Sequence, residues 1–82
     1  MLRLDITKDA ADFWGALDSK QYRQIGRKLL ALLNDPEPRD SSRLRGADDL
    51  LRTDIGEYRI VYRADDATVY VLGIGKRNDS EA

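Results

Sequence analysis

The sequence predicts a single small α+β domain in which a two-helix hairpin packs on one face of an antiparallel β-sheet. The 82-residue length allows one domain and no more, which we place over residues 1–82. Apolar residues recur at helical spacing between residues 8 and 33, whereas from residue 50 onward they alternate with a period of two. These patterns predict the element order β-α-α-β-β-β.

The first half contains a strand and both helices. Leu2, Leu4 and Ile6 alternate with charged residues, which predicts a short strand with one buried face. Thr7 then occupies an N-cap position, and Asp18-Ser19 breaks the helical pattern. The apolar stripe of the first helix is Ala10, Phe13, Trp14 and Leu17, and that of the second is Tyr22, Ile25, Leu29, Leu32 and Leu33.

The second half is predicted to be mostly sheet. Residues 34–49 hold both prolines, two serines and a glycine, so we interpret them as an ordered connector without a packed element. Residues 50–55, 58–63 and 68–74 are rich in β-branched and aromatic residues. Turns at 56–57 and 64–67 should join these three strands as an antiparallel meander.

Composition excludes several chemistries. The chain has no His and no Cys, which removes imidazole catalysis, thiol nucleophiles and disulfides, and leaves no zinc site of the usual kind. The 14 basic and 15 acidic residues balance, so a nucleic-acid role needs a local basic cluster. The absence of Cys favours a cytoplasmic location, and Met1 leads directly into an alternating strand without a leader or membrane-length apolar run.

Cations concentrate on the predicted strands. Alternation puts Arg52 and Asp54 on one face of their strand and Arg59 and Arg63 on one face of the next. One interpretation is a solvated sheet face on which nearby carboxylates balance these charges.

Three tyrosines of the predicted strands have a structural interpretation. Tyr58 and Tyr62 fall on the opposite face from Arg59, so we expect them to pack under the helices. Tyr70 shares a face with Leu72, and we interpret it as a core residue rather than a ligand-stacking one.

Three ordered segments of the chain resemble the RelE/ParE toxin superfamily. They are Arg43-Leu44-Arg45-Gly46, then GEYRIVY over residues 56–62, and GIGKRNDSE over residues 73–81. The resemblance implies a RelE-like fold and the toxin of a type II toxin–antitoxin system, neutralised by a cognate antitoxin in a hetero-oligomeric complex. The Gly-Lys-Arg end is more similar to the RelE branch, whose members cleave mRNA in the ribosomal A site. The implied activity is a metal-independent, cofactor-free endoribonuclease (mRNA interferase) that inhibits translation.

The resemblance also implies roles for individual residues. Cleavage through the 2′-hydroxyl needs a proton acceptor, cations at the phosphate and a donor to the departing 5′-oxygen. Arg52, Arg59 and Arg77 match catalytic positions, with guanidinium groups suited to clamping a phosphate and Arg77 near the leaving oxygen. Arg45 and Lys76 match positions better suited to binding substrate phosphates, and Lys76 is the one lysine after Lys28 that could lose a proton near the site.

Two positions depart from the family pattern. Asp54 stands where RelE-like enzymes usually carry a second Lys or Arg; it could neutralise Arg52 or Arg59, serve as the base, or be structural. The family usually continues past the Glu81 position into an aromatic residue that stacks on the substrate base, whereas here Ala82 is last. We therefore expect a chain truncated relative to its gene product, with activity lowered by the loss of a stacking platform.

These departures and the acidic pI of about 5.3 keep other functions open. One alternative is a ParE-like poison of DNA gyrase or a catalytically weakened binding module on the same fold. Another is an inert remnant retained for complex formation and autoregulation.

Overall fold

Both predicted helices form; the first begins at the predicted cap, and the second begins at the predicted break. The computed structural model describes residues 1–77, except for the side chains of residues 47 and 48. Helix α1 (Lys8–Gly15) begins after Thr7, whose side chain accepts a hydrogen bond from the Ala10 backbone N–H at 3.3 Å. Helix α2 (Ser19–Asn34) begins after Asp18, which caps the Gln21 N–H at 3.2 Å. The buried face of α2 consists of Ile25, Leu29, Leu32 and Leu33.

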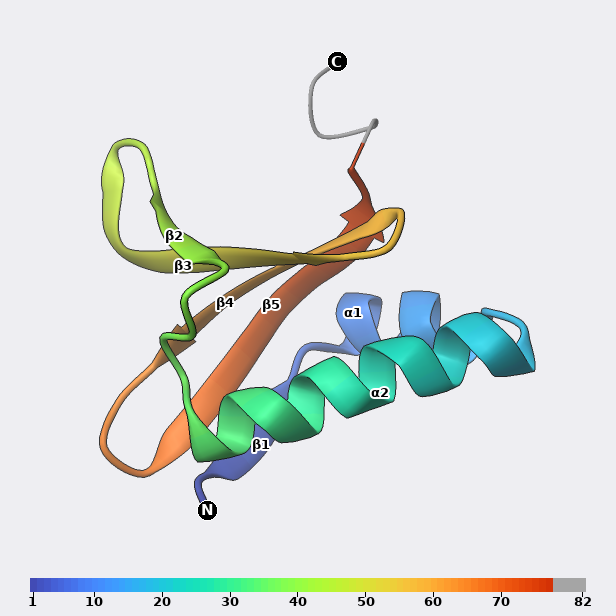
Figure 1. Cartoon of the computed structure of the whole chain (residues 1–82), viewed down its shortest axis with the longest axis horizontal. Coiled ribbons are helices and arrows are strands. Elements are labelled where there is room, and N and C mark those ends of the chain that lie inside the picture. The colour runs from blue at the N-terminus through green and yellow to red at the C-terminus, as the bar shows by residue number, and fades with distance from the viewer. Residues whose placement is uncertain (78–82) are drawn as a thin grey trace.

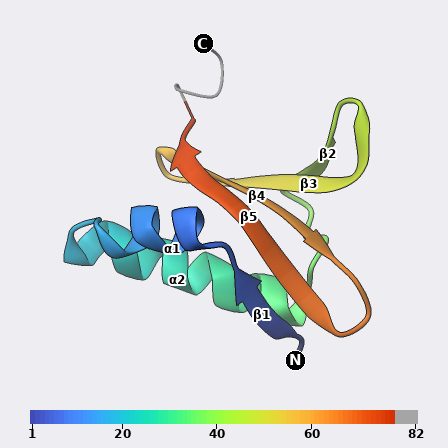
Figure 2. The same cartoon turned by 180° about the vertical axis from the view of Figure 1, so that it is seen from behind.

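Five strands form one mixed sheet of order β1-β5-β4-β3-β2. Strands β3 (Ala47–Ile55), β4 (Tyr58–Ala64) and β5 (Thr68–Lys76) make the predicted antiparallel meander. Strand β1 (Arg3–Ile6) pairs with β5 in parallel, so the prediction of a wholly antiparallel sheet is wrong at this edge. The chain runs from β1 through the helical hairpin into the other strands, and its last strand, β5, returns to lie beside β1 (Figure 2).

The predicted connector over residues 34–49 contains an additional strand, which is a second correction. Strand β2 (Ser41–Leu44) pairs antiparallel with β3, and β3 itself begins at Ala47. Gly46, with a φ of 79°, lies in the turn between them. The sequence of β2 has no alternating apolar pattern that would predict a strand. Its backbone pairing with β3 at the sheet edge makes this segment a strand.

The helices cover one face of the sheet and leave the other uncovered (Figure 1). Tyr58 and Tyr62 lie on the covered face, as predicted, with exposed fractions of 6% and 0%. The Tyr62 hydroxyl donates to the Pro36 carbonyl at 2.7 Å and so ties β4 to the segment that follows α2. We call the other side, which holds the predicted cations of β3 and β4, the open face. Within the described residues, no helix is both long and apolar enough to cross a membrane.

Candidate functional site: an arginine cluster on the open face

Three arginines, from β3, from β4 and from the residue after β5, surround Asp54 on the open face. The sheet register pairs Asp54 with Arg59 and Arg52 with Val61, and Arg59 is paired in turn with Gly75 of β5. Arg77 follows β5 directly. We call Arg52, Arg59 and Arg77, together with Asp54, the arginine cluster. Strand pairing therefore brings together the three predicted catalytic residues, which span 25 positions in the sequence.

Asp54 links two of these arginines directly. Its Oδ1 accepts a hydrogen bond from Arg59 Nε at 2.9 Å, and its Oδ2 lies 3.3 Å from Arg77 Nε. The hydrogen bond from Arg59 lowers the pKa of the Asp54 carboxyl below its ordinary value of 3.8, and the charges of Arg59, Arg77 and Arg52 lower it further, against partial burial. Asp54 is therefore ionised at neutral pH and is a weak base.

The other contacts of the arginines fix their positions. Arg52 Nε donates to the Ser42 hydroxyl at 3.1 Å, which connects the cluster to the edge strand β2. Arg77 is held at the β3–β4 turn, where its backbone N–H donates to the Glu57 carbonyl at 2.8 Å and its Nη1 to the Gly56 carbonyl at 3.3 Å. Gly56 has a φ of 58°, a conformation that disfavours residues with a Cβ, so this turn depends on glycine.

The surface beside the cluster is bare on β5. Gly73 and Gly75 pair with Val61 and Arg59, and a Cβ at either glycine would meet no atom within 4 Å. Side chains at these two positions would stand over the same stretch of the open face. Their absence leaves room for a ligand next to Arg59.

The two predicted phosphate-binding residues lie elsewhere. Lys76 pairs with Tyr58, whose side chain is on the helix-covered face, so the register puts Lys76 on the opposite side from Arg59. Arg45 is exposed in the β2–β3 turn, which projects away from the carboxyl end of β5 in both views (Figures 1 and 2). The structure brings neither residue to the arginine cluster. The expected chain truncation and the missing aromatic concern residues 78–82 and lie outside the described residues.

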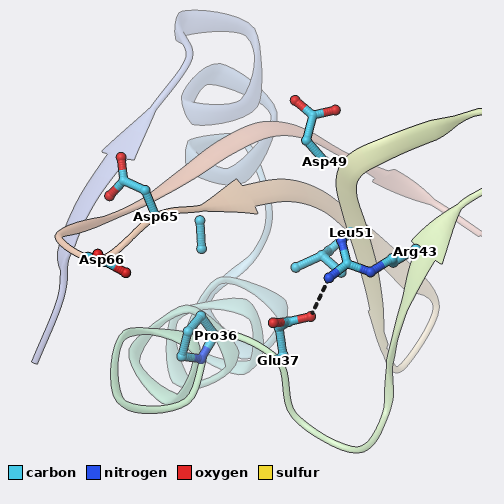
Figure 3. Close-up of a pocket in the computed structure, with 8 residues that line it drawn as sticks. Pro36, Glu37, Arg43, Asp49, Leu51, Asp65 and Asp66 are labelled. Atoms are coloured by element: carbon cyan, nitrogen blue, oxygen red, sulfur yellow. Dashed lines mark hydrogen bonds and ion pairs between the residues drawn. The ribbon is translucent and has the colours of Figure 1, made fainter.

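A cleft at another place in the fold is acidic. It has a volume of about 510 Å³ and lies between the segment after α2, strands β2 and β3, and the β4–β5 turn (Figure 3). Its charged lining residues are Glu37, Asp49, Asp65, Asp66 and Arg43, the last paired with Glu37 at 3.2 Å. The near-zero net charge of the chain thus conceals a separation of acidic and basic surfaces, because several carboxylates gather here, away from the arginine cluster.

The interpretation of Tyr70 as a core residue is wrong. Tyr70 is half-buried on the open face, where Arg63 Cζ lies 4.0 Å from the centroid of its ring. The Tyr70 hydroxyl donates to Asp65 Oδ2 at 3.1 Å. The alternation of β5 could not place Tyr70 because both faces of that strand carry apolar residues; its pairing with Arg63 follows from the register alone.

The fold, a helical hairpin packed on one face of a five-stranded mixed sheet, matches the fold of solved RelE toxin structures. A family model for ParE toxins of type II toxin–antitoxin systems, parDE, matches residues 4–81. The chain therefore belongs to this toxin family, and the predicted membership of the RelE/ParE superfamily is confirmed. No curated protein sequence matches the chain.

Solved structures of RelE toxins and their complexes are similar over nearly the whole chain. A chain of the intact E. coli RelBE toxin–antitoxin complex has 30% identity and a TM-score of 0.80, with 93% of this chain and 96% of that chain covered. The isolated E. coli RelE toxin has 29% identity and a TM-score of 0.80, with 99% and 94% covered. The archaeal RelE–RelB complex from Pyrococcus horikoshii OT3 has 28% identity and a TM-score of 0.80, with 93% and 94% covered.

Proposed function

We propose that this toxin is a ribosome-dependent mRNA endonuclease whose arginine cluster binds the phosphate at the cut. The observation that carries the proposal is the convergence of Arg52, Arg59 and Arg77 around a single carboxylate on an uncovered sheet face. A phosphate presents the same kind of anionic oxygen acceptors as Asp54, and guanidinium groups bind such oxygens strongly.

The cluster suits charge stabilisation better than proton abstraction. Arginine keeps its proton at any physiological pH, and the low pKa of Asp54 makes that carboxylate a weak base. Arg52 and Arg59 stabilise the charge that grows on the phosphate, while Arg77 donates a hydrogen bond to the departing 5′-oxygen. With the arginines supplying both charge stabilisation and the hydrogen bond to the leaving oxygen, the toxin acts without a metal.

Dependence on the ribosome follows from the same chemistry. Among the described residues, the arginine cluster includes no strong base, and it lies on an open sheet surface rather than in a deep pocket. Such a site gains most from a substrate that is already held in line for attack, because orientation alone lowers a barrier by several kcal/mol. The ribosomal A site supplies mRNA held in this way.

An antitoxin is the second partner that we propose. Two of the similar structures are complexes of RelE with RelB. Co-expression of the chain with the neighbouring reading frame should give a stable hetero-oligomer on size-exclusion chromatography and should relieve growth arrest. A chain that stays uncomplexed and toxic in the presence of that neighbour would contradict this partner.

Primer extension on translating mRNA tests the nuclease activity. Induction of the toxin should produce cuts in register with codons. Arg77→Ala should reduce the cleavage rate about tenfold or more, because it removes a charge-assisted hydrogen bond worth roughly 1.5–3 kcal/mol. Arg39→Ala, which removes an exposed arginine from the segment before β2, is the matched control and should cut like the wild type.

Poisoning of DNA gyrase is the second candidate function. Two observations favour it: the matching family model is that of ParE toxins, and an acidic residue, Asp54, lies between the arginines. Intact mRNA together with DNA breaks covalently linked to gyrase would establish this activity and overturn the nuclease proposal.

A further inference from the structure

A hollow lies on the open face beside the edge strand β1. The parallel register pairs Arg3 with Thr68 and Asp5 with Tyr70, so these four side chains share the open face. The hollow has a volume of about 420 Å³ and is lined by Arg3, Leu4, Asp5, Thr68 and Tyr70. We call it the Tyr70 hollow.

The aromatic wall of the hollow is held in place. The Arg63 guanidinium carbon lies 4.0 Å from the Tyr70 ring centroid, and the Tyr70 hydroxyl donates to Asp65 Oδ2 at 3.1 Å. Asp65 is itself fixed, because its Oδ1 accepts the backbone N–H groups of Ala67 and Thr68 at 2.8 and 2.9 Å. An aromatic ring and a guanidinium that are already ordered lose little conformational entropy when a planar ligand stacks on them.

The hollow lies on the same sheet face as the arginine cluster. Arg63 and Arg59 are four residues apart on β4 and point to the same side, which separates them by roughly 13 Å along the strand. Consecutive nucleotides of an extended RNA strand cover such a distance. A strand with one phosphate at the cluster can therefore place a nearby base at the hollow.

We propose that the Tyr70 hollow binds a nucleobase of the RNA strand whose phosphate the arginine cluster holds, and that it prefers guanine. Tyr70 and Arg63 provide the stacking surface. The Asp5 carboxylate, which lines the hollow on the neighbouring strand β1, accepts hydrogen bonds from the two adjacent N–H donors on the Watson–Crick edge of guanine, a pair that adenine, cytosine and uracil lack. The proposal deepens the proposed function and rests on it for the identity of the strand.

Binding of short, non-cleavable RNA to the isolated toxin tests the hollow without requiring cleavage. The probes are fluorescein-labelled 2′-O-methyl tetranucleotides that differ in a single base, with guanine, adenine, cytosine or uracil at each position in turn, measured by anisotropy at low salt. At one position the guanine probe should bind more tightly than the other three. Equal affinities for all bases at every position would overturn the guanine preference.

Substitutions in the hollow separate stacking from base recognition. Tyr70→Leu should weaken binding roughly fivefold or more, in line with the usual contribution of one stacked base, whereas Tyr70→Phe should retain it. Asp5→Asn changes an exposed side chain. It should abolish the guanine preference and leave the affinity that stacking on Tyr70 contributes. Tyr22→Leu, which removes an aromatic side chain of α2 that is 43% exposed, is the control and should bind like the wild type.

The outcomes distinguish this proposal from the proposed function. Wild-type affinity and base preference in Tyr70→Leu and Asp5→Asn would overturn the Tyr70 hollow even if the toxin cleaves mRNA on ribosomes. Base-selective binding that depends on these residues would support the hollow even if primer extension shows no cuts.

Discussion

Replacing Asp54 by Asn should increase the affinity of the toxin for RNA and lower its stability. Asp54 pairs with Arg59 and Arg77 at 2.9 and 3.3 Å, and an RNA phosphate at the cluster would have to share those arginines with it. Two unit charges about 5 Å apart repel by about 1 kcal/mol in water and about 3 kcal/mol at an effective dielectric constant of 20. Because the Asp54 side chain is 35% exposed, solvent screening favours the lower figure. A gain of about 1 kcal/mol is roughly fivefold in affinity.

The stability of the variant should change in the opposite direction. Arg59 is only 16% exposed and would lose its carboxylate partner, so we expect the free energy of unfolding to fall by about 1–2 kcal/mol at pH 7. The pKa of Asp54 is depressed by folding, so its stabilising effect is complete above 3.8 and is lost as the pH falls through the folded pKa. The difference in stability between the wild type and Asp54→Asn should therefore shrink below pH 3.8.

Two assays measure these effects. Calorimetric titration with a non-cleavable tetranucleotide over a series of salt concentrations gives the affinity, and urea denaturation at pH 7 and pH 3 gives the stability. Asp66→Asn, in the exposed β4–β5 turn, makes the same change in net charge away from the cluster and should leave both quantities nearly unchanged. If both variants raise the affinity equally, the effect is one of net charge, and the argument that Asp54 competes with phosphate is refuted.

Three further predictions concern the framework of the site and are measured by urea denaturation. Gly56→Ala should lower the free energy of unfolding by about 1–2 kcal/mol, because a φ of 58° is unfavourable for alanine. The alanine Cβ would also lie 2.9 Å from Gln24 Nε2. Gly56→Asn should lower the free energy of unfolding less, because asparagine adopts a positive φ more readily. Tyr62→Phe should lower the free energy of unfolding by about 1 kcal/mol, because it removes the hydrogen bond to the Pro36 carbonyl. Since burial raises the pKa of Tyr62 above its ordinary value of 10.0, the wild type should lose this advantage as the pH rises above that value. Thr7→Ala should cost about 1 kcal/mol through loss of the α1 cap, and an unchanged stability would contradict that role.

The elements with a regular apolar period were predictable from sequence. The stripe of α2 has the 3.6-residue period of a helix packed on one side, and its four buried residues are among those predicted. The alternation in β4 likewise assigned Tyr58 and Tyr62 to the covered face and Arg59 to the open one. In these segments burial depends on local periodicity, which a sequence displays directly.

The remaining elements depend on contacts between distant residues. Strand β2 is polar, and only its backbone pairing with β3 makes it a strand. The parallel pairing of β1 with β5 joins the two ends of the described chain, and no local pattern encodes the direction in which two such strands meet.

The sequence by itself determined the family, the helices, the three-stranded meander and which arginines are candidates for the site. Those features reside in local motifs and local periodicity. The tertiary structure alone decided that Asp54 lies between Arg59 and Arg77, that Lys76 belongs to the other face, and that Tyr70 packs against Arg63. Each of these depends on strand register, and a shift of one residue in register would exchange the two faces of a strand without altering its sequence.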